Sequence, residues 1–462
     1  MKQSGAITKI SAAIIAVIIL VSIVVGVWYA TKPGEEEEFV TITMVYWPGP
    51  ESEALEPVLE WYNSERAPET GIKVEMVCFS RAEFFTKQDT FLAAGSSDYD
   101  IITAGTYNIA HYAPHMVDIE DIKDEVDALG CLKTHLDGLT IDGKLYGIPC
   151  LGLNNWAFFY REDLINDLLT DNEKQETYKR ISEEYIGKEI TPKHPDDWLL
   201  EDWIATALYF TRGVNPDSPT VYGTAAYGKT GGFFTGWPLM NIVWLYGGRW
   251  FKPGTLEPDF TSEAWLNGMN IYDNFRKWGI WPTEMYNWEY PDVDGALRSG
   301  LIAFAGHFSI QWAALNDPEQ TEYAGKFVMT RPPGLLQSDG TIKRYLYVNP
   351  VGLGVTKYSK HQEEAKMFLL EMLSPEMERR YVAEGGVPQT AAIIAEASAT
   401  RPDLAIDLEL IDKYGFTVPV LPETISIQVA MSGHISGVIA GTETPEEALS
   451  AIQAEVEEIL GV

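Results

Sequence analysis

Residues 40–50 read Val-Thr-Ile-Thr-Met-Val-Tyr-Trp-Pro-Gly-Pro and open the folded part of the chain. Apolar side chains alternate with others over residues 40–46, and this period of two predicts a β-strand. Trp47-Pro48-Gly49-Pro50 predicts a loop at the end of that strand, because proline and glycine interrupt regular structure. Apolar residues at helical spacing over residues 55–62 then predict a helix.

The same order of elements continues to residue 103. A second alternating stretch covers residues 72–78, a helical pattern covers 84–94, and a third strand is predicted at 99–103. Strands that alternate with helices form a parallel sheet covered by helices. Ligands of such sheets bind beyond the carboxyl ends of the strands, so we expect a site beside residues 47–50 and 104–107.

Signals for further elements continue to the end of the chain. An extended stretch over residues 145–153 is interrupted by Asn154-Asn155-Trp156 and resumes over 157–160. Residues 171–190 are charged and predict a solvent-exposed helix, and residues 195–210 predict another. In the helical C-terminal third, Ser374-Pro375 and Thr444-Pro445-Glu446-Glu447 each predict the start of a helix.

The first 30 residues predict a membrane anchor. Lys2 and Lys9 precede an uncharged apolar run of 18 residues from Ile10 to Val27, which Trp28-Tyr29 follow. At a rise of about 1.5 Å per residue, this run nearly spans a hydrocarbon core of about 30 Å. Lysines before the run and the glutamates at 35–38 favour a cytoplasmic N-terminus and an exported domain. We therefore expect a single-pass transmembrane helix in residues 1–30, an acidic tether in 31–38, and a soluble domain on the extracellular side.

Two other interpretations of this segment stay open. One is a removed secretory signal, although such signals usually have a shorter apolar core of about 7–15 residues. The other is a prepilin-like leader that is cleaved just before the apolar run. No cysteine follows the run, which excludes a bacterial-type lipoprotein anchor.

Composition indicates a large, acidic globular protein. About 420 residues remain after the first 38, more than one core usually holds, so two lobes are expected. The chain has 67 Asp and Glu against 34 Lys and Arg, a net charge of -33. Such a surface repels nucleic acid and anionic lipid, so we expect neither as a partner.

Three cysteines, Cys78, Cys131 and Cys150, are too few for a disulfide framework. An exported protein can still hold one bridge and one free thiol. Cys131–Cys150 is the pair to test first.

The sequence carries no strong signal for catalysis or for a bound metal or cofactor. His111 and His115 are four residues apart, but Pro114 argues against a regular helix, and no H-E-x-x-H pattern surrounds them. Gly352-x-Gly354 lacks the third glycine of a dinucleotide-binding fingerprint, and no Walker or G-x-S-x-G motif is present. We expect no catalytic residue, no metal site and no cofactor.

Five segments between residues 39 and 460 share their order and spacing with one protein family. They are Phe91-Leu92-Ala93-Ala94-Gly95 with Asp98-Tyr99-Asp100-Ile101-Ile102, residues 142–149 (DGKLYGIP) with 158–164 (FFYREDL), residues 297–306 (LRSGLIAFAG), Gly352-Leu353-Gly354-Val355 with residues 365–369 (AKMFL), and Gly385-Gly386-Val387-Pro388. Together they resemble the family 1 extracellular solute-binding proteins of ABC importers, the group that includes maltose-binding proteins.

The resemblance implies an α/β, two-lobe periplasmic-binding-protein-like fold (type II), with strands that cross at the base of a cleft. Lobe 1 would comprise residues 39–151 plus 351–387, and lobe 2 residues 152–350 plus 388–462. It implies a monomeric receptor domain that closes around a sugar or oligosaccharide and delivers it to an ABC permease. The chain departs from the family pattern in two places. An anchor replaces the lipobox cysteine, and His307-Phe308-Ser309 stands where tryptophan often follows the glycine.

Sugars are bound by aromatic rings, which stack on C–H faces, and by polar groups, which pair the hydroxyls. We therefore expect ligand contacts from residues near the expected cleft: Trp47, Thr103, Tyr107, Asn154, Asn155, Trp156, Trp237, His307, Asn349 and Glu384. Each aromatic residue has the alternative of a core position, the two asparagines that of a turn, and the histidine that of a buried structural residue. The Asp142-Gly143 pair predicts only a turn.

Three other functions stay open at this point. The same fold can receive a polyamine or another solute, which the acidic composition permits. A membrane-anchored carbohydrate-active enzyme would need two carboxylates facing one cleft, and the sequence nominates no such pair. A structural or sensory protein at the cell surface could use the fold without transport.

Overall fold

The computed structural model describes residues 39–80, 83–151, 156–232 and 234–462. The predicted transmembrane helix and acidic tether, residues 1–38, lie outside these ranges. Within them, none of the helices has both the length and the apolar character needed to cross a membrane.

A five-stranded sheet contains the first strands of the chain. Its order is β2 (Ile72–Cys78), β1 (Val40–Tyr46), β3 (Ile101–Gly105), β13 (Val351–Val355) and β6 (Ile148–Leu151). β1 pairs in parallel with β2 and β3, which confirms the predicted parallel sheet, while β13 runs antiparallel to β3 and β6. We call it the β1 sheet.

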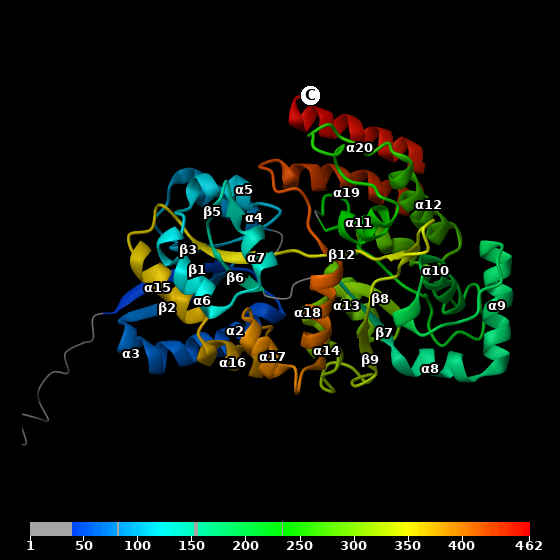
Figure 1. The fold of residues 1–462 in the computed structure, drawn as a ribbon, viewed down its shortest axis with the longest axis horizontal. Helices are drawn as coiled ribbons and strands as arrows, with labels where there is room; N and C mark the ends of the chain where they lie inside the picture. The colour runs from blue at the N-terminus through cyan, green and yellow to red at the C-terminus, as the bar shows by residue number, and fades with distance from the viewer. Residues whose placement is uncertain (1–38, 81–82, 152–155, 233) are drawn as a thin grey trace, which may run out of the picture.

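Helices cover the β1 sheet and connect its strands, as the alternating pattern predicts (Figure 1). α2 (Pro50–Trp61) follows β1 and α4 (Phe84–Ala94) follows β2. α15 and α16, from late in the chain, return to this part of the fold, where α15 contacts β1 and β13 and α16 contacts α2. The other helices and the small hairpin of this part are α3 (Ala67–Thr70), α5 (Ile109–Tyr112), α6 (Lys123–Leu129), α7 (Lys133–Gly138), β4 (Thr140–Ile141), β5 (Lys144–Leu145), α15 (Gln362–Met372) and α16 (Pro375–Ala383).

A second sheet has three antiparallel strands in the order β8 (Phe304–Phe308), β7 (Trp156–Arg161) and β9 (Phe327–Thr330). We call it the β7 sheet. Gly306 of β8 lies against Trp156, where an added Cβ would come within 2.0 Å of the indole Nε1, so only glycine fits there. Trp156 itself is 1% exposed, and this contact fixes its ring in the core.

Most of the remaining elements surround the β7 sheet on the right of Figure 1, while the helix Ala391–Ala397 packs against α16. They are α8 (Glu162–Thr170), α9 (Asn172–Ile186), α10 (Leu200–Tyr209), α11 (Gly236–Leu245), α12 (Glu263–Lys277), α13 (Tyr290–Arg298), α14 (Trp312–Leu315), α17 (Ala391–Ala397), α18 (Pro402–Tyr414), α19 (Thr424–Ala440) and α20 (Pro445–Leu460), with the paired short strands β10 (Leu335–Leu336) and β11 (Ile342–Lys343), and β12 (Leu346–Tyr347) and β14 (Gly415–Phe416).

Several helix boundaries follow the predicted capping signals. The Ser374 side chain caps α16, with Pro375 at its first position. Thr444 and Glu447 form a capping box at the start of α20. The predicted helix over residues 195–210 begins later than expected, because a short 3-10 turn at Pro195–Asp197 precedes α10. Asp142 and Gly143 make the predicted turn between β4 and β5, with positive φ angles of 51° and 78°.

The proposed Cys131–Cys150 bridge is wrong, because all three cysteines are free thiols. Cys150 lies in β6, where its Sγ accepts a hydrogen bond from the Tyr46 hydroxyl at 3.9 Å. The backbone of Cys131 instead forms an isolated antiparallel β-bridge with that of Thr390. Burial raises the pKa of both the Cys131 and the Cys150 thiol, so neither is a reactive thiolate.

The imidazole of His434 joins the last two helices. Its Nδ1 lies 2.9 Å from a Glu443 carboxylate oxygen, and its Nε2 lies 3.1 Å from one of Glu455. Burial lowers the pKa of His434, but the hydrogen bonds to the two carboxylates outweigh burial and raise it overall.

Candidate ligand-binding site

A cavity of about 710 Å³ lies between segments that belong to the two sheets. Its first wall comes from the β1 part of the fold: Trp47, Pro48, Gly49, Glu51, Glu53, Ser80, Phe84, Phe85 and Tyr107. Its second wall comes from the β7 part: Lys229, Thr230, Gly231, Gly232, Phe234, Glu289, Tyr290, Pro291, Phe308 and Ile310. Asn349 and Val351, where the chain enters β13, form what we call the base of the cavity. The volume lies within the range of about 300–1,000 Å³ that is typical of small-molecule sites.

Trp47 enters the first wall because β1 ends at Tyr46 and α2 starts at Pro50, four residues later. The Trp47 ring stacks on Tyr46, with centroids 5.1 Å apart, and meets Phe84 edge-on at 5.2 Å. Its indole N–H donates a hydrogen bond to the Glu51 carboxylate. Glu51 lies in the first turn of α2, where the helix dipole favours a negative charge.

Tyr107 enters the same wall just beyond β3. The Asn108 side chain accepts a hydrogen bond from the Gly105 N–H at 2.8 Å and fixes this turn. An added Cβ at Gly105 would come within 2.6 Å of the Tyr107 ring, so the close approach requires glycine. The Tyr107 ring meets Phe85 edge-on at 5.8 Å, and Tyr107 is only 3% exposed.

The second wall is built from the loop 229–232 and the start of α13. Two serines one turn apart on α19 hold this loop. The Ser432 hydroxyl accepts a hydrogen bond from the Gly231 N–H at 3.0 Å, and the Ser436 hydroxyl accepts one from the Thr230 hydroxyl at 2.7 Å. Lys229 pairs with Glu289 at 3.1 Å across the wall. Both side chains of this pair are exposed, so the pair contributes little to stability.

Aromatic rings connect the two walls under the cavity. Tyr107 lies 6.3 Å from Trp237, Trp237 lies 5.8 Å from Phe308, and Phe308 lies 6.0 Å from Tyr290. Asn349 adds a polar group at the base, where its side-chain oxygen accepts a hydrogen bond from the Thr106 hydroxyl at 3.2 Å. The cavity thus presents apolar ring faces beside carboxylates and an amide.

Three of the ten predicted contact residues line the cavity together: Trp47, Tyr107 and Asn349. Asn154 and Asn155 lie outside the described residues. Thr103, Trp156, Trp237, His307 and Glu384 are absent from its lining.

The structure gives a physical reason for each of these five positions. The Thr103 hydroxyl bonds the Val45 carbonyl at 2.8 Å within the β1 sheet. Trp156 packs on Gly306, and Trp237 is fully buried beneath the rings of the cavity. Glu384 is exposed at the end of α16.

His307 lies fully buried behind the second wall. Its Nδ1 is 2.8 Å from the Tyr227 hydroxyl, and its Nε2 is 4.0 Å from Asp294. Burial lowers the pKa of His307 to about 3, so the ring is neutral. This is the structural role that the sequence left as the alternative.

The sequence interpretation missed most of the second wall. Lys229, Tyr290 and Phe308 come from a loop, a helix start and a strand end that are far apart in the chain. Glu51 directly follows the predicted loop at 47–50, but the predicted helix over 55–62 begins too late to include it, whereas the observed α2 starts at Pro50. In the parts of the chain that the structure describes, no three His, Cys, Asp or Glu side chains are grouped as metal ligands.

Two sheets with a ring-lined cavity between them define a class of proteins that receive a small solute in a cleft. Residues 64–379 match the model of one such family, described as bacterial extracellular solute-binding protein. The match covers more than half of the 462 residues, so the chain belongs to this family, as the resemblance in its motifs implies. The family consists of binding proteins rather than enzymes, and the carbohydrate-active enzyme is therefore not retained.

Two relatives match most of the chain. A probable amino-acid ABC transporter periplasmic-binding protein of Sinorhizobium fredii is 22% identical over 403 residues, 85% of this chain and 83% of the relative. An uncharacterized ABC transporter extracellular-binding protein of Pyrococcus horikoshii is 21% identical over 365 residues, 75% of this chain and 71% of the relative.

Solved structures share the fold over nearly the whole described chain. Maltose-bound MalE3 of T. maritima superposes with a TM-score of 0.75 at 18% identity, covering 90% of this chain and 99% of that one. A solute-binding protein of Agrobacterium vitis with bound D-mannitol gives 0.71 at 20% identity, covering 92% and 98%. This chain therefore has the α/β periplasmic-binding-protein-like fold.

Proposed function

We propose that this protein is the membrane-anchored, extracellular substrate-binding protein of an ABC transporter, and that it binds a sugar, a sugar alcohol or an oligosaccharide in the cavity. The observation that carries the proposal is the cavity of about 710 Å³, with aromatic rings on both walls and polar side chains between them. Relatives named as ABC transporter proteins and structural neighbours with bound maltose or D-mannitol support it.

The lining provides both kinds of contact that a sugar requires. Trp47, Tyr107, Phe234 and Tyr290 offer ring faces for its C–H groups. Carboxylates and the Asn349 amide would pair with hydroxyls, which would otherwise lose their hydrogen bonds to water at a cost of about 1–3 kcal/mol each.

Binding would close the two walls on the ligand. In the proposed division, lobe 1 is residues 39–151 plus 351–387 and lobe 2 is residues 152–350 plus 388–462. The return of β13 to the β1 sheet supports this division. A ligand that touches both walls favours the closed arrangement by its greater affinity for it, and the closed form then docks on the permease.

The anchor is proposed from the sequence of residues 1–30 alone. It would hold the receptor at the extracellular face of the cell membrane and raise its effective concentration near the permease. Mass spectrometry of the protein purified from its native membrane tests this proposal. A mature N-terminus beyond residue 30 would show that the segment is removed.

A thermal-shift screen tests the ligand class. The purified protein would be heated with maltose, longer maltooligosaccharides, D-mannitol, ribitol, single amino acids and spermidine. A true ligand at 100 times its dissociation constant stabilises the folded protein by about 2.7 kcal/mol. Stabilisation by an amino acid or spermidine, with none from any sugar or sugar alcohol, would overturn the proposed ligand class.

One observation favours a second candidate, a receptor for a cationic solute such as a polyamine. Among the described lining residues, Glu51, Glu53 and Glu289 are acidic and Lys229 is the counterpart cation. A surplus of carboxylates favours a ligand with ammonium groups. The same screen decides between the two, because spermidine and maltose are tested side by side.

A further inference from the structure

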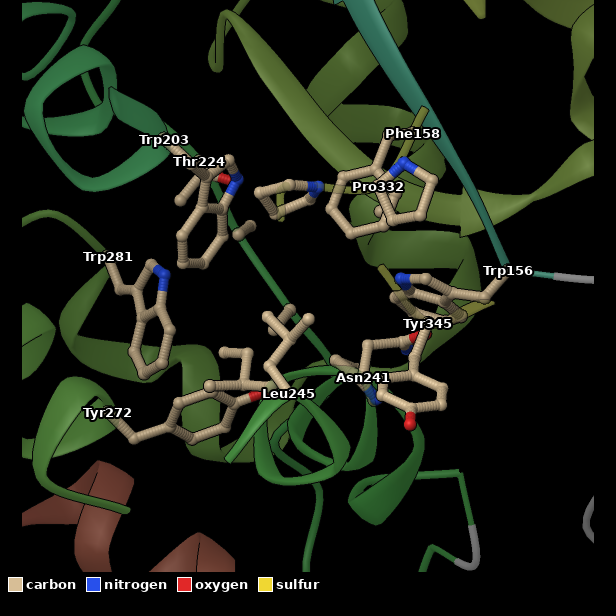
Figure 2. A pocket seen from close by; sticks show the side chains of 16 residues that line it. Trp156, Phe158, Trp203, Thr224, Asn241, Leu245, Tyr272, Trp281, Pro332 and Tyr345 are labelled. Atoms are coloured by element: carbon tan, nitrogen blue, oxygen red, sulfur yellow. The ribbon is translucent and has the colours of Figure 1, made fainter. Parts of the chain in front are cut away.

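A second, much smaller cavity lies within the β7 part of the fold (Figure 2). Its volume is about 30 Å³, and it shares no lining residue with the large cavity. Figure 2 shows Trp203, Thr224 and Trp281 along one side of it, with Tyr272 and Leu245 below them. These side chains come from α10, α11, α12 and the segments beside them, so the cavity lies where several elements meet.

Four polar atoms of this lining share one property. Each belongs to a side chain that is at most 8% exposed, and each is without a hydrogen-bond partner among the residues that the structure describes. They are Trp203 Nε1, Thr224 Oγ1, Tyr272 Oη and Trp281 Nε1. Buried polar groups in folded proteins nearly always have a partner, so four such atoms around one cavity point to an occupant.

The chemistry of these atoms restricts that occupant. An indole N–H only donates, so the occupant must accept hydrogen bonds from Trp203 and Trp281. The hydroxyls of Thr224 and Tyr272 can donate or accept. A water molecule has two acceptor positions and two protons, and it can serve both kinds of group at once.

Other occupants fit less well. An apolar molecule would leave all four polar atoms unpaired. An anion could accept from all four groups, but the lining contains no charged side chain, and a buried charge without a counter-charge is strongly disfavoured. A cation would face the positive ends of two indole N–H groups.

We infer that this cavity is a structural water site, in which ordered water hydrogen-bonds at least two of the unpaired polar atoms of Trp203, Thr224, Tyr272 and Trp281. A volume of about 30 Å³ exceeds the roughly 10–15 Å³ that one water requires. The four atoms belong to α10, to α12 and to the segments around residues 224 and 281, and none of them has a direct hydrogen bond within the described residues. The inference does not depend on the identity of the transported solute.

A crystal structure of the protein in chloride-free buffer tests the inference. The expected result is a density peak within about 3.2 Å of at least two of the four polar atoms. A second crystal soaked in sodium bromide separates water from an anion, because bromide scatters anomalously. An anomalous peak in the cavity, or a dry cavity in which the side chains pair directly, would overturn the assignment.

Two isosteric variants complete the test. Thr224→Val removes one hydroxyl from the site and should displace or delete the water peak. Thr220→Val is the matched control, because the Thr220 hydroxyl is buried but bonds the Phe210 carbonyl at 2.6 Å and lies outside this cavity. The control should keep the peak. A peak that is unchanged in Thr224→Val and lost in Thr220→Val would contradict the inference.

Discussion

Replacing Trp47 with alanine removes the largest ring of the first wall. The ring is 6% exposed, packs on Tyr46 and Phe84, and faces the cavity. Aromatic residues in well-packed binding sites contribute about 2 kcal/mol or more when truncated. Because about 1.4 kcal/mol corresponds to a tenfold change in affinity, we expect Trp47→Ala to weaken ligand binding about thirtyfold.

The same change also lowers stability, so affinity and folding must be separated. Truncating a buried tryptophan costs about 3–5 kcal/mol of stability. Trp47→Phe keeps an apolar ring and loses the indole N–H that bonds Glu51. We expect Trp47→Phe to bind more weakly than the native protein but more tightly than Trp47→Ala, because the ring face remains.

Calorimetric titration with a sugar selected by the thermal-shift screen measures these affinities. Trp250→Phe is the matched control: Trp250 is fully buried, its indole N–H bonds Met240 Sδ at 3.2 Å, and it does not line the cavity. This control should lower the melting temperature and leave the affinity unchanged. If Trp47→Ala is folded and binds within about twofold of the native protein, a change of only about 0.4 kcal/mol, Trp47 is not a ligand contact.

Three further predictions concern stability. The pKa of His434 is raised in the folded state, so its stabilising contribution is complete below the unfolded pKa of about 6.5 and is lost as pH rises through the folded value. His434→Gln should therefore reduce the change of the urea unfolding midpoint with pH between pH 5 and 9. An unchanged pH dependence would refute this. Burial lowers the pKa of His307 to about 3, so its stabilising contribution is present above about pH 6.5 and is lost as pH falls toward 3. His307→Gln should therefore make the urea unfolding midpoint fall less between pH 7 and pH 4. An equally steep fall would count against this explanation. Gly306→Ala should lower the melting temperature, because the added Cβ would collide with Trp156. Gly295→Ala in α13 is the control: nothing lies within 4 Å of its added Cβ, so it should leave the melting temperature unchanged or raise it by favouring the helix. Equal effects of the two variants would remove the steric explanation.

Much of the fold could be predicted because local patterns and the structure agree. The alternation over residues 40–46 and the helical spacing after it predict β1 and α2, and both form. Thr444 and Pro445 mark the start of α20 for a purely local reason, the pairing of end groups in the first turn. The return of β13 to the β1 sheet depends on contacts between residues far apart in the chain. It could be predicted only from the resemblance to a protein family.

The candidate site was predicted in part for the same reason. Trp47 and Tyr107 follow strands whose carboxyl ends meet at one edge of a parallel sheet, so their proximity could be inferred. Thr103 could not be separated from them, because every residue of β3 is buried and the strand has no exposed face to compare. Trp237 and His307 have residue types that suit a sugar site, but their burial depends on packing that no local pattern contains.

The contacts at the base of the cavity indicate how the proposed closure could proceed. Tyr107 touches Trp237 from the other side of the cavity, and Asn349 is bonded to Thr106 where the chain enters β13. Because these residues are almost fully buried, the base cannot open widely without exposing rings and breaking that hydrogen bond. The exposed side chains of Glu53 and Lys229 line opposite walls without such constraints. Closure about the base would therefore move the walls most where the cavity meets solvent, and a solute held between the rings would be enclosed by this movement.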